Sequence, residues 1–191
     1  MPQQTHKPEY RFIRATRSLL TIWRGQRPEV RFCFLFVVFF ALLYWLLIGT
    51  HGSETTWTIE DIVTRSVVWV SGQVLALLGV VASTEGDVLK TAHFGVRVLS
   101  GCNGMEAVVM YGAAVFAYPT SLRAKGIALL VGLPAIQFVN VARILGLLMI
   151  GQYWPTWFHD AHVFWAQGVM ICLVAAVWFW WIDRYGYTTA S

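Results

Sequence analysis

Runs of about twenty apolar residues recur along this chain and constrain its fold more than any other feature. A helix of that length matches the hydrocarbon thickness of a bilayer. Five segments qualify: Phe32 to Gly49, Ile62 to Ala82, Asn103 to Pro119, Gly126 to Ile150 and His162 to Ile182. With 57% hydrophobic and 13% charged residues among 191, the chain does not have the composition of a soluble domain. The sequence therefore predicts an all-α integral membrane protein with about five apolar helices.

Positive charge is concentrated before the first apolar run. Seven of the 14 Lys and Arg residues lie there: Lys7, Arg11, Arg14, Arg17, Arg24, Arg27 and Arg31. Such a flank stays in the cytoplasm and is attracted to anionic lipid. No small-x-small cleavage site follows Ile48, so the first helix is expected to be an uncleaved anchor. We expect a basic cytoplasmic segment over 1–31, one multi-pass membrane domain over 32–182 and a short cytoplasmic tail over 183–191, with no nucleic-acid partner.

The loop charges give a topology. The loop over 50–61 carries acidic residues without Lys or Arg, whereas Arg123 and Lys125 occupy the tight loop after Pro119. The first loop is therefore expected outside and the second inside. Five full crossings do not satisfy both, so one segment must differ. We favour a helix over 62–82 that lies along the outer interface or dips in without crossing; the alternative is a true span with the amino terminus outside.

The chain turns polar between Ser83 and Gly101. Glu85-Gly86-Asp87 is typical of a turn, and apolar and polar residues alternate from His93 to Val98. This pattern predicts a short β-hairpin at the outer face, directly before Cys102.

Cys102 is the cysteine with a distinctive setting. Cys33 and Cys172 lie inside apolar runs, where a thiol behaves as a small hydrophobic group. Cys102 instead stands between Gly101 and Asn103, where we expect the third helix to begin. Free N–H groups at a helix start favour an anion, and the thiolate is the nucleophilic form of cysteine. A buried cysteine that caps the helix is the structural alternative.

Arg143 lies within an apolar run, where a guanidinium costs roughly 2.5–3.5 kcal/mol on insertion scales. Gln137, Asn140 and Arg143 follow at spacing three and form a polar stripe on one helix. Glu106 reaches a similar depth on the preceding helix, so a structural Glu106–Arg143 ion pair is one interpretation. The planar fork of an arginine also suits a carbonyl oxygen or carboxylate, which is the second interpretation.

Two histidines flank the start of the last helix. His159 and His162 lie beside Asp160 and among several tryptophans, at the same face of the membrane as Cys102 in the preferred topology. A histidine that acts as general base for a cysteine is the more specific use. No HExxH motif and no third ligand accompany the pair, so neither a metal nor another cofactor is expected.

Three motifs together resemble the exosortase/archaeosortase family: Ser100-Gly101-Cys102-Asn103-Gly104-Met105-Glu106, then Asn140-Val141-Ala142-Arg143, then His162-Val163-Phe164-Trp165. The resemblance covers roughly residues 79–182, and the small size and the Gly-Cys-Asn-Gly form are most similar to the compact exosortase H branch. It implies a multi-pass transpeptidase that cleaves a carboxy-terminal sorting signal. Cys102 is then the nucleophile, His162 the base or acid and Arg143 the group that stabilises the transition state. Asn103, where the family often has serine, together with Glu106, Asn140 and His159, is expected to bind substrate or support the site.

The resemblance also implies partners and a location. The substrates would be membrane-anchored proteins with a short motif, of IPTL type in the exosortase H branch, followed by an apolar helix and a basic cluster. The enzyme would lie in the bacterial inner membrane with its active site at the outer, periplasmic face. The acceptor nucleophile is not indicated. Two other functions compete with this one: a non-enzymatic scaffold or assembly factor that uses the Glu106–Arg143 pair, and a transporter that binds an anionic solute at Arg143.

Overall fold

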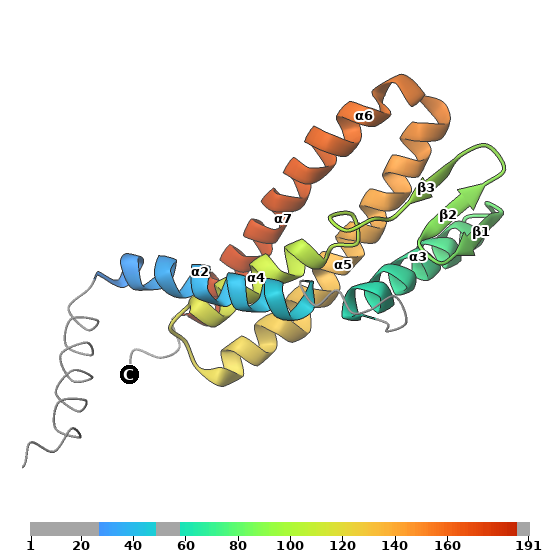
Figure 1. The fold of residues 1–191 in the computed structure, drawn as a ribbon. Coiled ribbons are helices and arrows are strands. Elements are labelled where there is room, and N and C mark those ends of the chain that lie inside the picture. Colours follow the sequence, from blue (N-terminus) through green and yellow to red (C-terminus); the bar gives the residue numbers. More distant parts are fainter. Residues whose placement is uncertain (1–26, 49–57, 187–191) are drawn as a thin grey trace, which may run out of the picture.

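The computed structural model describes residues 27–48 and 58–186 (Figure 1). Most of the basic amino-terminal segment, the acidic loop over 50–57 and the last residues of the predicted tail lie outside this part of the chain. The predicted boundaries of the leader, membrane domain and tail therefore stay predictions. Within the described residues the protein is mainly helical and carries one small antiparallel sheet.

Among residues 27–48 and 58–186, three segments are long and apolar enough to cross a membrane: α2 (Pro28–Leu47), α5 (Leu122–Tyr153) and the segment Pro155–Tyr185. A shorter apolar helix, α4 (Met105–Ala117), accompanies them. α2 begins at a proline, whose missing N–H is not needed in the first turn, and it packs along α4 (Figure 1). The prediction of an all-α membrane protein is confirmed.

The core of the helical part lies between α4, α5 and α7 (Ala166–Trp181). The Tyr111 ring packs so close to α5 that a Cβ at Gly132 would overlap it, and its hydroxyl donates to the Ala128 carbonyl at 3.0 Å. Trp181 Nε1 donates to the Ala124 carbonyl at 3.0 Å. These two bonds satisfy buried polar atoms in an apolar setting, and they fix how α4 and α7 meet the first turns of α5.

α3 (Ile59–Leu77) differs from the other long helices. It begins with a capping box, in which the Thr58 side chain accepts from Asp61 N and the Asp61 carboxylate accepts from Thr58 N. It carries three charged residues in its first half and is not among the apolar spans of the described chain. One side of α3 contacts the sheet and another contacts α5. The preferred interpretation of an interfacial or re-entrant helix stays a prediction.

The sheet has three antiparallel strands in the order β1 (Ala82–Glu85), β2 (Val88–Thr91) and β3 (Gly95–Arg97). Gly86 forms the first turn with φ +61°, a conformation that favours glycine. Leu89, which is fully buried, faces Val67 and Val68 of α3. The expected hairpin is confirmed, and the alternating segment from His93 adds a third strand that leads directly to the Cys102 loop.

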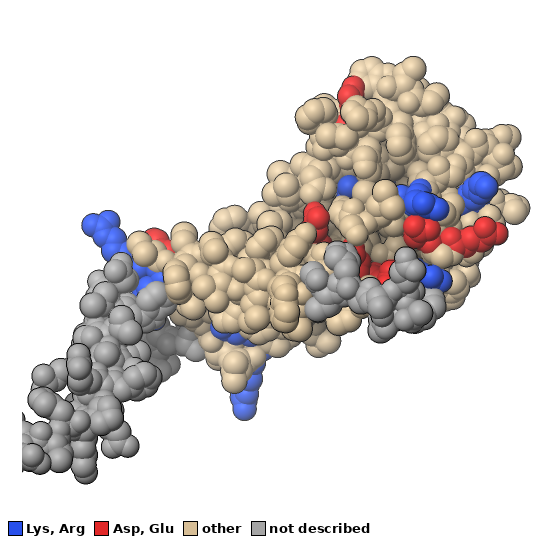
Figure 2. Space-filling view, viewed as in Figure 1, with Lys and Arg blue, Asp and Glu red and all other residues tan. Residues whose placement is uncertain are grey.

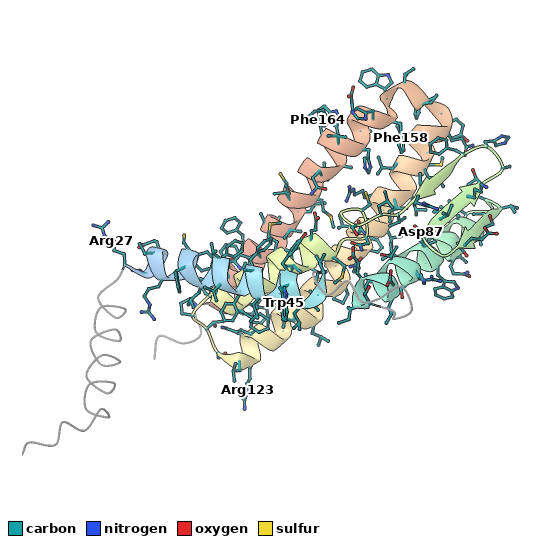
Figure 3. All side chains as sticks on the ribbon, in the orientation of Figure 1. Arg27, Trp45, Asp87, Arg123, Phe158 and Phe164 are labelled. Carbon is teal, nitrogen blue, oxygen red and sulfur yellow. The ribbon has the colours of Figure 1, made fainter. Side chains whose placement is uncertain are left out.

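Charged side chains are unevenly distributed. Figure 2 shows acidic and basic residues gathered over the sheet and the adjoining α3, with a broad uncharged surface between them and the other end of the molecule. Figure 3 labels Arg27 and Arg123 near that other end and Asp87 on the sheet. An uncharged band between two charged ends is typical of a membrane protein.

Candidate active site

The loop between β3 and α4 holds Cys102. The Cys102 N–H donates to the Leu99 carbonyl at 2.9 Å, which closes a tight turn. Gly101 and Gly104 have φ of +86° and +81°, so a side chain at either position would be strained. The helix starts at Met105 with Gly104 as its N-cap, so Cys102 lies three residues before α4 and not within its first turn. Our expectation that the helix begins at the cysteine is corrected by this glycine, whose left-handed backbone delays the helix.

Asn103 fixes this loop to α3. Its side chain is fully buried, and Nδ2 donates to Glu60 Oε1 at 3.1 Å and to Thr64 Oγ1 at 3.0 Å. Its Oδ1 accepts from Met105 N at 3.0 Å, an interaction of the Asx-turn type that starts α4. Since every polar atom of the amide is bonded, the residue after the thiol is held rigidly from two elements.

Arg143 reaches the loop from α5. Its Nη1 donates to the Gly101 carbonyl at 3.5 Å, and its Nη2 lies 3.9 Å from Cys102 Sγ. Its Nε is buried and has no hydrogen-bond partner among the described residues. Because α5 continues to Tyr153, Arg143 lies about 15 Å from the end of its helix at 1.5 Å per residue. Arg143 is therefore deeper than we expected from an apolar segment that ends at Ile150.

His162 approaches the thiol from the last helical segment. Its Nε2 lies 3.7 Å from Cys102 Sγ, within reach of a thiol–imidazole hydrogen bond. The residue lies in η2, a π-helical turn over Ala161–Trp165, and such turns often occur at functional sites. His162 Nδ1 is buried without a hydrogen-bond partner among the described residues. Within the described residues, therefore, no hydrogen bond to Nδ1 orients the imidazole.

Aromatic packing takes that orienting role. The Phe158 ring lies parallel to the His162 ring, with centroids 6.0 Å apart and an interplanar angle of 7°. Phe94, just before β3, meets Phe158 edge to face at 5.4 Å, and its own ring fills the space that a Cβ at Gly151 would take. Phe158 was not singled out in the sequence analysis. The spacing of four residues between Phe158 and His162 on a helix was the available signal for the stacked pair.

Burial raises the pKa of the Cys102 thiol above its ordinary value. The Arg143 guanidinium opposes this shift through its charge and its hydrogen bond, whereas the Glu106 carboxylate adds to it. Desolvation is the largest of these effects, so the net shift favours the protonated thiol. A nucleophilic role for this cysteine therefore requires a base, and His162 is the basic group in contact with the sulfur.

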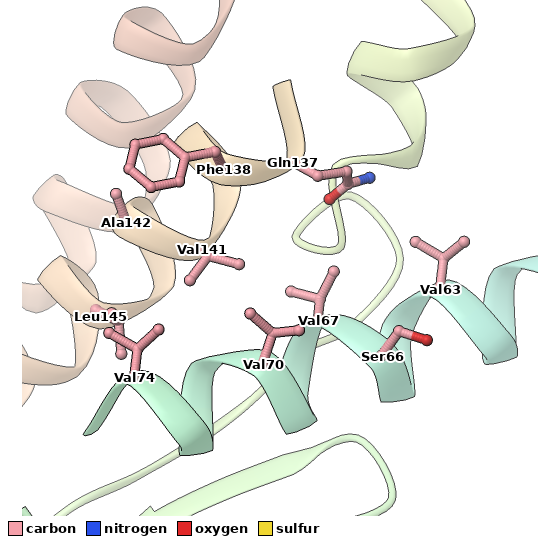
Figure 4. A pocket seen from close by; sticks show the side chains of 10 residues that line it. All are labelled: Val63, Ser66, Val67, Val70, Val74, Gln137, Phe138, Val141, Ala142 and Leu145. Carbon is pink, nitrogen blue, oxygen red and sulfur yellow. The ribbon is translucent and has the colours of Figure 1, made fainter. Parts of the chain in front are cut away.

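The thiol opens into a hollow of about 210 Å³, lined by β3, the loop and two helices: Phe94, Gly95, Val96, Arg97, Val98, Cys102, Ile144, Leu147, Phe158 and His162. A second hollow, of about 380 Å³, lies between α5 and α7 and has Arg143 among its mostly apolar lining residues. A larger groove of about 580 Å³ between α3 and α5 is almost wholly apolar and does not touch the thiol (Figure 4). The small hollow is the candidate active site because it alone among these three contains the sulfur.

The other predicted site residues lie at varying distances from the sulfur. Glu106 is exposed, and its carboxylate lies beside Gly101. It forms no ion pair with Arg143; within the described ranges, an ion pair joins Arg97 to Asp87 at 3.4 Å on the sheet. His159 is exposed and forms no hydrogen bond to Cys102 in the structure. The ion pair on which the scaffold interpretation depends is therefore not formed.

Asn140 lies behind the loop. It is fully buried on α5, yet neither atom of its amide has a hydrogen-bond partner among residues 27–48 and 58–186. The buried Gln137 Oε1 is also unpaired in that part of the chain. Both side chains lie against Gly104, where a Cβ would come within 3.1 Å of them. The structure thus brings together Cys102, Arg143 and His162, with an unsatisfied amide pair on the far side of the loop.

A comparison with protein families assigns the chain to one of them. The family model described as transmembrane exosortase matches residues 18–181, and the chain therefore belongs to that family. Membership supports a membrane transpeptidase-type role in general terms. The comparisons with curated proteins and with solved structures gave no match.

Proposed function

We propose that this protein is a membrane cysteine transpeptidase that cleaves the carboxy-terminal sorting signals of exported proteins and transfers the new carboxyl terminus to an acceptor. The observation that carries the proposal is the set of contacts on one sulfur. Cys102 Sγ has His162 Nε2 at 3.7 Å and Arg143 Nη2 at 3.9 Å, from two different helical segments. A nucleophile in contact with both a base and a cationic donor is the arrangement that acyl transfer requires.

The first step forms an acyl-enzyme. His162 Nε2 takes the proton of the Cys102 thiol as the sulfur attacks the peptide carbonyl, because the raised pKa leaves little free thiolate. Arg143 donates to the oxygen of the tetrahedral intermediate, where negative charge develops. The carbon–nitrogen bond then breaks, and His162 returns the proton to the leaving amine. The product is a thioester between Cys102 and the amino-terminal part of the substrate.

The second step resolves the thioester. An acceptor bearing a hydroxyl or amine gives up its proton to His162 and attacks the same carbonyl. The carbon–sulfur bond then breaks, and the leaving Cys102 sulfur takes that proton from His162, which restores the free enzyme. Water in that role would give hydrolysis, so the enzyme transfers only where the acceptor reaches the thioester faster than water. The thiol lies in a small, largely apolar hollow, and the exclusion of water from such a site favours transfer over hydrolysis.

The substrates are membrane-anchored proteins whose signal has a short motif, of IPTL type in the branch that the motifs resemble, followed by an apolar helix and basic residues. A substrate held by its own helix reaches the thiol within the plane of the bilayer, so modest recognition suffices. The hollow between α5 and α7, which has Arg143 among its lining residues, offers an apolar approach to the site. We place the amino terminus in the cytoplasm and the thiol at the outer face of a bacterial inner membrane. The separation of Arg27 and Arg123 from the sheet supports this orientation (Figure 3).

The test is a co-expressed membrane reporter that carries an IPTL-type signal, followed on a gel by its size. Replacement of Cys102 by Ala is expected to abolish processing with unchanged enzyme abundance. Cys33 and Cys172 provide matched controls, since both are exposed on apolar helices, and their replacement by Ala is expected to leave processing intact. Unchanged processing by the Cys102→Ala variant would remove the nucleophile and favour the scaffold function.

A further inference from the structure

β3 is an edge strand. It pairs with β2 in the antiparallel register Val88↔Arg97, Leu89↔Val96 and Lys90↔Gly95. On its other side no strand of the described chain pairs with it, because the sheet order is β1-β2-β3. An unpaired edge presents a row of main-chain donors and acceptors that another extended chain can use.

The register shows which groups face that edge. Val98 N donates to the Asp87 carbonyl and Thr91 N to the Phe94 carbonyl, both at 2.8 Å. In an antiparallel ladder the residues that exchange such bonds alternate with residues whose main-chain groups point away. Phe94, Val96 and Val98 therefore turn their main-chain groups toward β2. The N–H and C=O groups of Gly95 and Arg97 point to the free edge.

This edge forms one wall of the thiol hollow. Five consecutive residues, 94–98, line the hollow together with Cys102 and His162. Side chains of a strand alternate between its two faces, so consecutive residues line one cavity only where the main chain itself borders it. The opposite wall is apolar and comes from α5 and from Phe158.

We propose that the substrate segment preceding the apolar helix binds as an added fourth strand on β3, paired with the main chain of Gly95 and Arg97, so that its scissile carbonyl meets Cys102. This inference rests on the proposed function and names its mode of substrate recognition. Main-chain pairing supplies affinity without regard to sequence, and alternate side chains of the peptide enter the hollow and supply selectivity. Arg97 is exposed and paired with Asp87, and a charged residue on a short edge strand discourages pairing with unrelated chains. A substrate that its own membrane helix holds beside the strand can still pair with it.

Two proline substitutions on opposite edges of one sheet test the proposal in the full-length enzyme, with the IPTL-type reporter as probe. Arg97→Pro removes an N–H that points to the free edge, which an edge strand tolerates. Thr84→Pro is the matched control, because by the same alternation Thr84 turns its main-chain groups to the far edge of β1. In the complex with Arg97→Pro, one main-chain carbonyl of the substrate would lack its N–H donor, so we expect a loss of about tenfold or more in processing. Thr84→Pro is expected to process the reporter at the wild-type rate.

A second measurement keeps the test independent of folding. The purified wild-type enzyme is given synthetic peptides of the reporter signal, each with one N-methylated amide. If cleavage is lost when the methyl group stands at every second amide along the peptide, the added strand is supported. A uniform loss at all amides, or no loss at any of them, overturns it. Wild-type processing by Arg97→Pro overturns it as well. Failure of the proposed function is recognised separately, since Cys102→Ala would then process the reporter like the wild type.

Discussion

Replacement of Asn103 by Ala is expected to loosen the nucleophile loop and to destabilise the protein. The side chain donates to the Glu60 carboxylate and the Thr64 hydroxyl and accepts from Met105 N, all within 3.1 Å and with no exposure of Asn103. A hydrogen bond to a charged group contributes about 1.5–3 kcal/mol and a neutral one about 1 kcal/mol. The sum is about 3.5–5 kcal/mol, and because neighbouring bonds are not additive we expect a loss of about 3 kcal/mol.

The assay is unfolding of the purified enzyme in mixed micelles by titration with SDS, followed by circular dichroism. Thr64→Val removes one of the three bonds and is expected to cost about 1 kcal/mol. In a double-mutant cycle, Asn103→Ala and Glu60→Ala are expected to be less destabilising together than the sum of the two, because each already breaks the shared bond. An Asn103→Ala variant within about 0.5 kcal/mol of the wild type would refute the reasoning, since surface substitutions have effects of that size.

Three further predictions concern the surroundings of the thiol. Glu106→Gln removes a carboxylate that raises the pKa of Cys102, so at fixed neutral pH more thiolate forms and iodoacetamide alkylates Cys102 faster. An unchanged pH profile of the alkylation rate would contradict this. Phe158→Leu loses a ring stack worth about 0.5–1.5 kcal/mol, so kcat should fall about two- to twelvefold through misorientation of His162 while KM is kept. Phe158→Tyr keeps an aromatic ring and should restore kcat, and equal rates for the two variants would argue against stacking. Asn140→Leu removes a buried amide that has no hydrogen-bond partner among the described residues, so the SDS concentration at the unfolding midpoint should be kept or raised. Reporter processing should fall, because Asn140 is expected to bind substrate or support the site. A lower midpoint with unchanged processing would instead make Asn140 structural.

The meeting of Cys102, Arg143 and His162 was predictable from the sequence. A loop-charge count brought their segments to one membrane face, and the polar–apolar alternation before Cys102 predicted strands there. The structure places a His162 nitrogen and an Arg143 nitrogen each within 4 Å of the Cys102 sulfur. Short motifs in separate apolar segments were enough, because few topologies are available to a small membrane protein.

Contacts between distant elements were not predictable. Asn103 gives no periodic signal that connects it to Glu60 and Thr64, which lie about forty residues earlier on α3. The sequence placed Glu106 and Arg143 at similar depth and so suggested an ion pair. The structure instead turns Arg143 toward the Gly101 carbonyl and the thiol. Depth along a helix follows from residue counting, but the direction of a side chain depends on how the helices rotate against each other.

The π-helical turn at His162 was also hidden from sequence reasoning. One extra residue in a turn changes which side of a helix each later residue occupies, and no composition rule marks it. The turn aligns His162 with Phe158 and with the thiol at the same time. The choice between His159 and His162 therefore needed the local backbone, where His162 alone of the two contacts the sulfur.

Capture of the acyl-enzyme tests the central claim most directly. The purified enzyme is incubated with the reporter, quenched in acid and digested, and the peptide that contains Cys102 is measured by mass spectrometry with and without hydroxylamine. The account predicts an adduct of the amino-terminal reporter fragment on Cys102 that hydroxylamine removes, as it does a thioester. Cleavage of the reporter with no adduct on Cys102, or with the adduct on another residue, would contradict it.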